Sequence, residues 1–193
     1  MLIELPTGSN LRGESALATL RSTGTLGECR YRTGAGDITM EQITGVTELT
    51  TGTGAVRVDR IGGSATIKNS NGDTWIGEII GNLQVKAANG KIGVDRAGGA
   101  VTVKTANGDV RLDEVTCGAI VAATACGKVD VGVRSGVAAW LDLHTGVGHV
   151  RNLLDASQQP GPSEGTVQVR ARSSFGDITI RSADFGDSGQ GAA

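Results

Sequence analysis

The chain has 193 residues, of which 31 are glycine and only 3% are aromatic, and its formal net charge is −2. This length suits a single domain, and such evenly mixed charge argues against a nucleic-acid-binding protein, which usually carries a strongly basic face. The sequence has no run of ~18 apolar residues and therefore no predicted membrane span.

The start of the chain and the cysteines predict the compartment. The first residues lack a cationic group, and Glu4 and Pro6 interrupt the apolar ones, so they do not form a signal peptide. Cys29, Cys117 and Cys126 show no disulfide or metal-ligand spacing. As far as this chain extends, we expect a reduced, cytoplasmic protein.

A nine-residue repeat is weak in residues 1–26 and becomes regular at Gly27. The residues two and four after each repeat glycine are nearly all apolar, and the residue between them is mostly polar, which is typical of a half-buried strand. We interpret residues 1–26 as degenerate first coils, because terminal repeats are usually atypical. The repeat glycines are Gly27, Gly36, Gly45, Gly54, Gly63, Gly72, Gly81, Gly90, Gly99 and Gly108.

Alternate nine-residue units differ, so the true period is eighteen residues. The unit at 54–62, GAVRVDRIG, ends in charged residues and a hydrophobic residue, whereas the unit at 99–107, GAVTVKTAN, ends in Thr-Ala-Asn. This alternation predicts an all-β, single-stranded β-solenoid (a β-helix or β-roll) whose parallel strands stack at ~4.8 Å. A separate third strand at residues 59–61 would make the section triangular, and both a triangular and a two-faced section fit the sequence.

The β-solenoid domain is expected to span residues 1–181, with regular coils at 27–136 and a capping region at 137–181. One residue is inserted between Cys117 and Gly127, and the longer unit after Gly136 predicts a bulge near Trp140. Pro, Gly and Ser predict a loop at 155–165. Two strands at 166–172 and 176–181 are expected to cover the open C-terminal end, followed by a disordered tail at 182–193.

Two polar columns recur beside the glycines. Asn71, Asn89 and Asn107 are eighteen residues apart and are expected to stack as a hydrogen-bonded turn ladder. Aspartates that follow glycine resemble the calcium-binding nonapeptide only superficially, because Ala55 and Lys91 occupy the same column. We therefore predict no metal site. These aspartates are Asp37, Asp73, Asp109 and Asp177.

Charged columns follow the outward positions of the coils. Lys68, Lys86 and Lys104 form a basic column, which is either a solvated face that discourages sheet stacking or a binding face for a repetitive polyanion. On the other face, acids and bases alternate, so neighbouring coils are expected to form ion pairs that contribute ~0–1 kcal/mol each. These residues are Glu41, Asp59, Arg60, Glu78, Asp95, Arg96, Asp113 and Glu114.

Catalysis has little support in the sequence. His144 and His149 flank a glycine turn without zinc-ligand spacing, and no nucleophile elbow, phosphate loop or dinucleotide motif is present. Cys29 lies in an inward column and is expected to be inert. We therefore predict no catalytic residues, no cofactor and no enzymatic activity.

Several segments carry a resemblance to a known family: LPTGSNL at 5–11, TGAGDI at 33–38, TANGDVRL at 105–112, GVAAWLDL at 136–143, GHVRNLL at 148–154 and FGDITIR at 175–181. Through them the chain resembles the bacterial β-strand-repeat adhesin domains of unknown function, the actinobacterial branch in particular. The resemblance covers nearly the whole chain. It implies a β-solenoid and an adhesin-like label, and it assigns no activity or binding residue.

These observations favour a non-enzymatic structural or binding scaffold of unknown partner. The first alternative is surface or polysaccharide adhesion, and the second is a β-helix carbohydrate-active enzyme that uses the Asp and Glu columns. The expected partner is a protein, a polyanion or a polysaccharide. Leu2, Ile3 and Leu5 are expected to lie in a strand that leaves the N-terminal end exposed, so the oligomer is either a monomer or a homodimer through the N-terminal coils.

Overall fold

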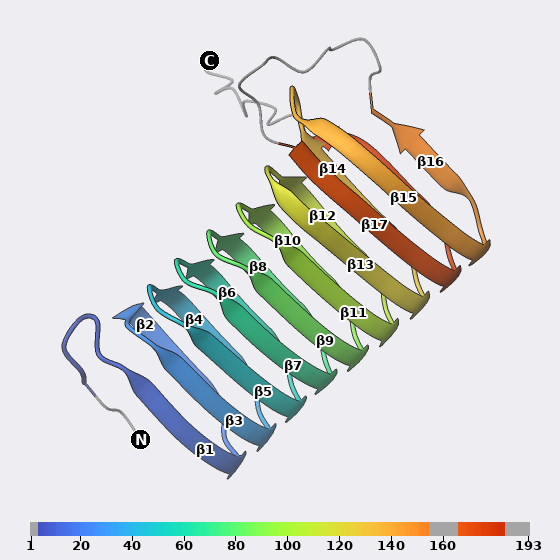
Figure 1. Ribbon diagram of the computed structural model, residues 1–193. Helices are drawn as coiled ribbons and strands as arrows, with labels where there is room; N and C mark the ends of the chain where they lie inside the picture. The colour runs from blue at the N-terminus through green and yellow to red at the C-terminus, as the bar shows by residue number, and fades with distance from the viewer. Residues whose placement is uncertain (1–3, 155–165, 184–193) are drawn as a thin grey trace, which may run out of the picture.

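The computed structural model describes residues 4–154 and 166–183, and these residues form two stacked parallel sheets (Figure 1). The odd-strand sheet has the order β1-β3-β5-β7-β9-β11-β13-β17-β15, and the even-strand sheet has the order β16-β18-β14-β12-β10-β8-β6-β4-β2. The odd strands are β1 (Leu11–Leu17), β3 (Cys29–Ala35), β5 (Thr47–Thr53), β7 (Ala65–Asn71), β9 (Leu83–Asn89), β11 (Val101–Asn107), β13 (Gly118–Cys126), β15 (Ala138–Val147) and β17 (Thr166–Phe175). The even strands are β2 (Leu20–Leu26), β4 (Ile38–Ile43), β6 (Val56–Ile61), β8 (Thr74–Ile79), β10 (Ile92–Ala97), β12 (Val110–Val115), β14 (Val129–Arg134), β16 (Val150–Leu153) and β18 (Ile178–Ala183).

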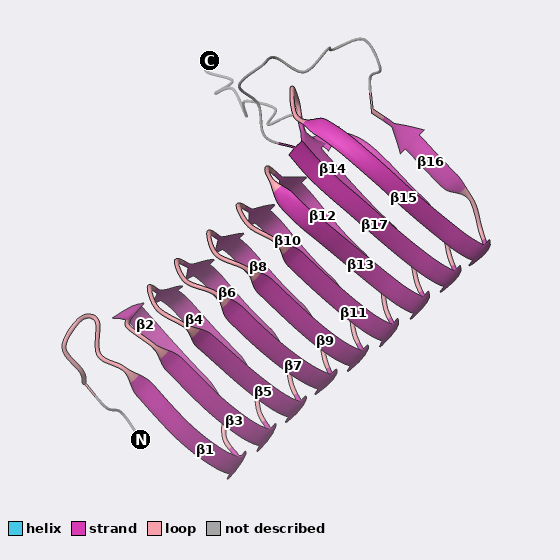
Figure 2. Ribbon diagram, in the orientation of Figure 1, coloured by secondary structure: helices cyan, strands magenta, loops and turns pink. Residues whose placement is uncertain are grey.

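The predicted β-solenoid and its eighteen-residue period are confirmed. In the regular coils each residue pairs with the residue eighteen positions on, as Ile67 does with Val85. The section is two-faced, because residues 59–61 continue β6 and do not form a strand of their own. The described part of the chain contains strands and loops without a helix, and so has no helix that could cross a membrane (Figure 2).

The core is a thin layer of aliphatic side chains between the two sheets. Val58, Ile67, Ile76 and Val85 are each fully buried, as the inward columns predict. Near one corner the inward column becomes polar, and its side chains bond to turn carbonyls. Asn69 Nδ2, for example, donates to Gly54 O at 3.0 Å. The buried backbone of the turn is thereby satisfied from inside the core.

The turns explain the glycine repeat. Gly90 has a φ of +136°, a backbone conformation that residues other than glycine rarely adopt. A Cβ at this position would also overlap the backbone of Gly72 in the preceding coil. Asp73 caps the same turn, since its Oδ1 accepts the backbone N–H of Lys91 at 2.8 Å. The Gly-Asp pair therefore lets successive coils stack in close contact.

The C-terminal strands do not follow chain order. The chain passes from β14 to β15 and β16, and then returns so that β17 and β18 lie inside them (Figure 1). β17 pairs with both β13 and β15, and β18 pairs with both β14 and β16. The expectation that these two strands cover the open end is therefore wrong, although they do extend the sheets. Their inward residues, such as Val167 and Ile178, are fully buried and suit an internal layer.

Three smaller expectations need correction. No bulge occurs near Trp140, because the extra residues lengthen β15, whose ten residues keep one register with β17. Leu5 lies outside the strands, since the first strand begins at Leu11, and Leu2 and Ile3 are outside the described residues. β18 runs to Ala183, so the expected tail does not begin at 182, and its remainder, 184–193, also lies outside the described residues, as does the predicted loop 155–165.

Candidate functional site

The predicted lysine column lies at the centre of the odd-strand sheet. Lys68 pairs with Lys86 and Lys86 pairs with Lys104, so the three side chains project from adjacent strands at ~4.8 Å intervals. All three are exposed, and none forms an ion pair with the described residues. From β7 to β13 this sheet carries no carboxylate, so the column has uncompensated positive charge.

The surface on both sides of this column is flat and uncharged. On one side Thr66, Gln84 and Thr102 are in register with one another. On the other side, two residues beyond each lysine, the side chains are Ser70, Ala88 and Ala106. The ammonium groups therefore stand above their neighbours, where a long partner can contact all three at once.

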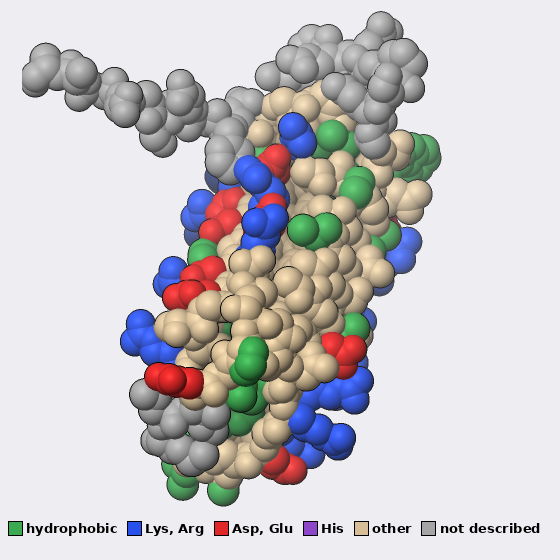
Figure 3. All heavy atoms as spheres, turned by 90° about the vertical axis from the view of Figure 1, so that its left-hand side faces the viewer, with side chains coloured by type: hydrophobic (Ala, Val, Ile, Leu, Met, Phe, Trp, Pro, Cys, Tyr) green, Lys and Arg blue, Asp and Glu red, His purple; other side chains and the backbone are tan. Residues whose placement is uncertain are grey.

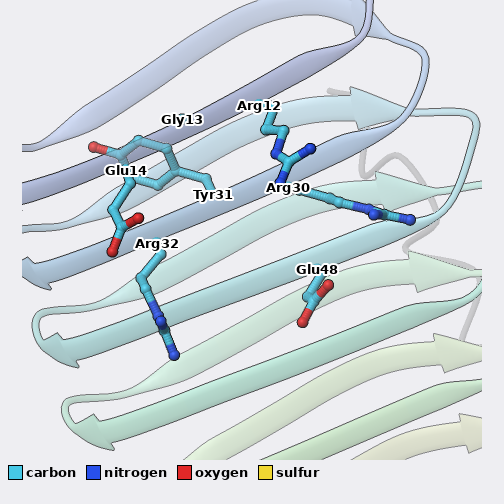
Figure 4. Close-up of a pocket in the computed structure, with 7 residues that line it drawn as sticks. All are labelled: Arg12, Gly13, Glu14, Arg30, Tyr31, Arg32 and Glu48. Carbon is cyan, nitrogen blue, oxygen red and sulfur yellow. The ribbon is translucent and has the colours of Figure 1, made fainter.

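An arginine hollow of about 470 Å³ lies on the same sheet near its N-terminal end (Figure 4). Arg12 pairs with Arg30 across β1 and β3, and Arg32 projects two residues further along β3. None of these guanidinium groups forms an ion pair with the described residues, although Glu14 and Glu48 also line the hollow. Arg32 occupies the column that continues into the lysines, because it pairs with Thr50, which pairs with Lys68.

A tyrosine packs behind this hollow because one position lacks a side chain. Tyr31 is 9% exposed, and a Cβ on Gly13 would lie 3.1 Å from its Cδ2 atom. Gly13 therefore leaves the space that the ring uses at the end of the core. Figure 4 shows the tyrosine ring next to Glu14, at one side of the group of charged side chains.

A tryptophan hollow of about 220 Å³ lies at the C-terminal end of the same face. Trp140, in β15, is 76% exposed and pairs with Gln168, which pairs with Ala119. Beside it, Arg170 Nε lies 2.9 Å from Asp142 Oδ2. The hollow thus combines an open aromatic ring with an amide and an ion pair.

The even-strand sheet differs, because most of the charges on its strands from β6 to β14 are paired. Arg60 Nε lies 3.1 Å from Glu78 Oε2, and Arg96 Nε lies 3.0 Å from Glu114 Oε2, each across neighbouring coils. Arg181 contacts both Asp113 and Asp130, the latter at 2.9 Å. Viewed at one edge, charged side chains gather along both flanks of an uncharged strip (Figure 3). The even-strand sheet is therefore nearly neutralised, whereas the odd-strand sheet is not.

A second tryptophan is held within these pairs. Arg57 lies over the Trp75 ring at 4.2 Å, and Trp75 Nε1 donates to Asp95 Oδ1 at 2.9 Å. Gly93 leaves room for the ring edge. Burial raises the pKa of Asp95, and the hydrogen bond from Trp75 opposes that rise. Trp75 is thus engaged within the protein, in contrast to Trp140.

The asparagine ladder is structural. Asn89 Nδ2 donates to Asn71 Oδ1 at 2.8 Å, and Asn107 Nδ2 donates to Asn89 Oδ1 at 2.9 Å. The aspartates after glycine cap turns, as Asp177 does by accepting the N–H of His149, and this bond lowers the pKa of Asp177. No group of three His, Cys, Asp or Glu residues is placed to hold a metal ion in the described residues.

The cysteines and histidines do not form a site together. Cys29 is fully buried, and burial raises the pKa of its thiol to about 11. Cys117 and Cys126 are free thiols; Cys117 is partly buried and Cys126 is exposed. His149 Nδ1 lies 3.6 Å from Asp177, whereas His144 lies on the outer surface of β15.

Sequence reasoning identified the lysine column but missed both hollows. The arginine hollow had a visible signal, because Arg12 and Arg30 are eighteen residues apart and Arg32 is two residues beyond Arg30. The tryptophan hollow had none, since Trp140 and Gln168 become neighbours only through the return of β17.

Comparisons with known proteins give one match. The Toastrack DUF4097 family matches residues 2–185 of the chain. No curated protein and no solved structure is significantly similar to it.

Proposed function

The chain belongs to the Toastrack DUF4097 family, whose domain has no known function, and we propose that it is a non-enzymatic β-solenoid scaffold that binds an extended anionic polymer along its odd-strand sheet. The observation that carries this proposal is the unpaired column of Lys68, Lys86 and Lys104 in the part of the odd-strand sheet, from β7 to β13, that has no carboxylate. If the anionic polymer is attached to a cell or to another surface, the same binding would give the protein an adhesin-like role.

A long anion fits this column better than a compact one. Stacked ammonium groups ~4.8 Å apart repel one another by about 1 kcal/mol per adjacent pair in water. A polymer whose negative charges recur at a short interval relieves that repulsion along the whole column. It also releases counterions on binding, so the affinity should fall steeply as salt rises.

The even-strand sheet is a poorer surface for the same ligand. Its arginines already face carboxylates, as Arg60 faces Glu78 and Arg96 faces Glu114. A polyanion would have to displace these acids before it could pair with the arginines. We therefore assign the binding surface to one face of the solenoid.

The carboxylates also favour a binding role over hydrolysis. A glycosidase places two carboxyl groups ~5–10 Å apart and raises the pKa of one by burial. Glu14 and Glu48 line the same hollow but are exposed, and strand spacing separates their backbones by roughly 12 Å. Asp95 is engaged by Trp75, and Asp113 is engaged by Arg111 and Arg181.

The test compares two double variants with the same change in net charge. Lys86→Gln with Lys104→Gln removes two members of the column, and Lys91→Gln with Lys128→Gln removes two exposed lysines at turns. Binding of polygalacturonate is measured by calorimetry at several salt concentrations. We expect the first variant to lose about 10-fold or more in affinity, or ~1.4 kcal/mol, and the second to stay within about two-fold. Equal losses in both variants would show that only net charge matters, and would refute the proposed face.

A further inference from the structure

We infer that the tryptophan hollow is a sugar-binding subsite, so that the polymer recognised by this face is an acidic polysaccharide rather than another polyanion. This inference rests on the proposed function and deepens it by naming the ligand class. It concerns the hollow of about 220 Å³ around Trp140, which the lysine column does not include.

The first support is the state of the Trp140 ring. It is 76% exposed, and no hydrogen bond or cation–π contact engages it within the described residues. The other tryptophan, Trp75, has an arginine over its ring and a carboxylate on its Nε1 atom. Exposed tryptophan is unusual away from interaction surfaces, because its large apolar ring gains much from burial.

The second support is the polar rim of the hollow. Gln168 is in register with Trp140 and offers both amide donors and an acceptor. Two residues further along, Asp142 and Arg170 form an ion pair at 2.9 Å. Sugars present apolar C–H faces that stack on aromatic rings, and hydroxyl groups around the edge that need both donors and acceptors. The combination of one open ring with this rim matches a pyranose.

The floor of the hollow leaves space for a sugar ring to stack on Trp140. Ala119 and Val121, in β13, lie in register with Gln168 and Arg170 and have short side chains. A ligand therefore enters from the open face of the sheet without displacing protein atoms. The exposed ring of Trp140 stands at one border of this floor.

The hollow lies on the same sheet as the lysine column, and Trp140 is four residues along β15 from His144, the position at which that column ends. Lys104 pairs with Ala123, Ala123 with Arg172, and Arg172 with His144 in β15. From β7 to β15 there are five strand intervals, or ~24 Å along the axis. Trp140 is also displaced by ~13 Å along the strand from the end of the lysine column, so a chain of several sugar units must cross the sheet diagonally to contact both the lysines and this ring.

The test uses the full chain and three probes: oligogalacturonate, polyglutamate of similar total charge, and neutral dextran. The variants are Trp140→Ala, Trp140→Phe and Phe175→Ala. Phe175 is also 60% exposed on β17 but does not line the hollow, so it controls for the loss of an exposed aromatic ring. Circular dichroism and thermal melting verify that each variant is folded.

We expect Trp140→Ala to weaken oligogalacturonate binding by about 10-fold, with polyglutamate binding unchanged within about two-fold. Trp140→Phe should retain most of the affinity, Phe175→Ala should retain all of it, and dextran should bind weakly or not at all. Quenching of tryptophan fluorescence by oligogalacturonate should disappear in Trp140→Ala, which keeps only Trp75.

Three results would overturn the inference. If Trp140→Ala binds oligogalacturonate with unchanged affinity, the hollow is not a sugar-binding subsite. If Trp140→Ala loses as much affinity for polyglutamate as for oligogalacturonate, the ring does not distinguish sugars from an acidic polypeptide. A changed oligomeric state in Trp140→Ala, measured by sedimentation, would assign the ring to an interface between copies. Each of these outcomes leaves the lysine-column test intact, so failure of the subsite is distinguishable from failure of the proposed function.

Discussion

The close stacking of the glycine turns predicts a large penalty for Gly90→Ala. The φ of Gly90 is +136°, and an added Cβ would lie 2.6 Å from the carbonyl carbon of Gly72. Backbone strain of this kind costs ~1–3 kcal/mol, and forcing an atom into a packed space costs a further ~1–3 kcal/mol. We therefore expect the free energy of unfolding to fall by about 4 kcal/mol, out of a typical total of ~5–15 kcal/mol.

Gly98→Ala is the matched control. Gly98 lies in a turn at the other edge of the same coils, its φ is outside the left-handed region, and the atom nearest to an added Cβ would be Ile79 O at 3.5 Å. That distance is an ordinary van der Waals contact. This variant should change the free energy of unfolding by less than about 1 kcal/mol, and a small gain is compatible with the reduced freedom of its unfolded chain.

Urea denaturation followed by circular dichroism measures both variants, with thermal melting as a second readout. For a chain of this size 1 kcal/mol corresponds to ~2–4 °C, so Gly90→Ala should melt roughly 10 °C lower. Repeat proteins can unfold in stages, and the two probes must therefore agree before a single free energy is extracted. Equal stability of Gly90→Ala and Gly98→Ala would refute the argument that backbone contact between coils requires glycine.

Three further outcomes are expected. Ile67→Asp, which buries a carboxylate at a fully enclosed position, should lower the free energy of unfolding by more than about 4 kcal/mol in urea titration, and an unchanged midpoint would contradict the inward assignment. A chain ending at residue 165 should lose amide-exchange protection in β15 and β16, because these strands pair only with β17 and β18, whereas retained protection would mean that they can dock on β13 and β14 directly. Cys29 should resist alkylation at pH 8 while Cys117 and Cys126 react. Because burial raises the pKa of the Cys29 thiol from its ordinary 9.0 to about 11, its contribution to stability is complete below pH ~9 and is lost as the pH rises through ~11. The pH dependence of unfolding in Cys29→Ala should lack this trend.

The regular coils were predictable because a short-range rule governs them. Alternation places Ile67 and Val85 inward, and the eighteen-residue period alone makes them stacked neighbours. The glycine and aspartate of each turn are likewise set by contacts with the preceding coil. Each of these features depends on residues one period apart, which a single sequence displays.

The C-terminal order was not predictable for the same reason. β15 and β17 both alternate apolar and polar residues, so either strand suits the place beside β13. The choice depends on which strand better tolerates an exposed edge. Trp140 and Leu153 stay exposed at that edge, whereas Val167 and Val169 are buried. Neither the eighteen-residue period nor the alternation of apolar and polar residues indicates which of β15 and β17 lies at the edge of the sheet. The tryptophan hollow forms only because β15 is the edge strand and β17 lies beside it.

The inserted layer formed by β17 and β18 has a consequence for how the protein is made. Ribosomes release a chain from its N-terminus at ~5–20 residues per second, so coils from β1 to β14 can dock in turn as they emerge. β15 and β16 emerge next, but among the described strands they pair only with β17 and β18, which are synthesised after them. Their assembly therefore waits until residue 183 has left the ribosome, so this end of the two sheets forms only after β18 has been translated. In this interval a nascent chain exposes Trp140 and the edges of β13 and β14 together, which makes it the stage at which a chaperone or a second nascent chain has access to them.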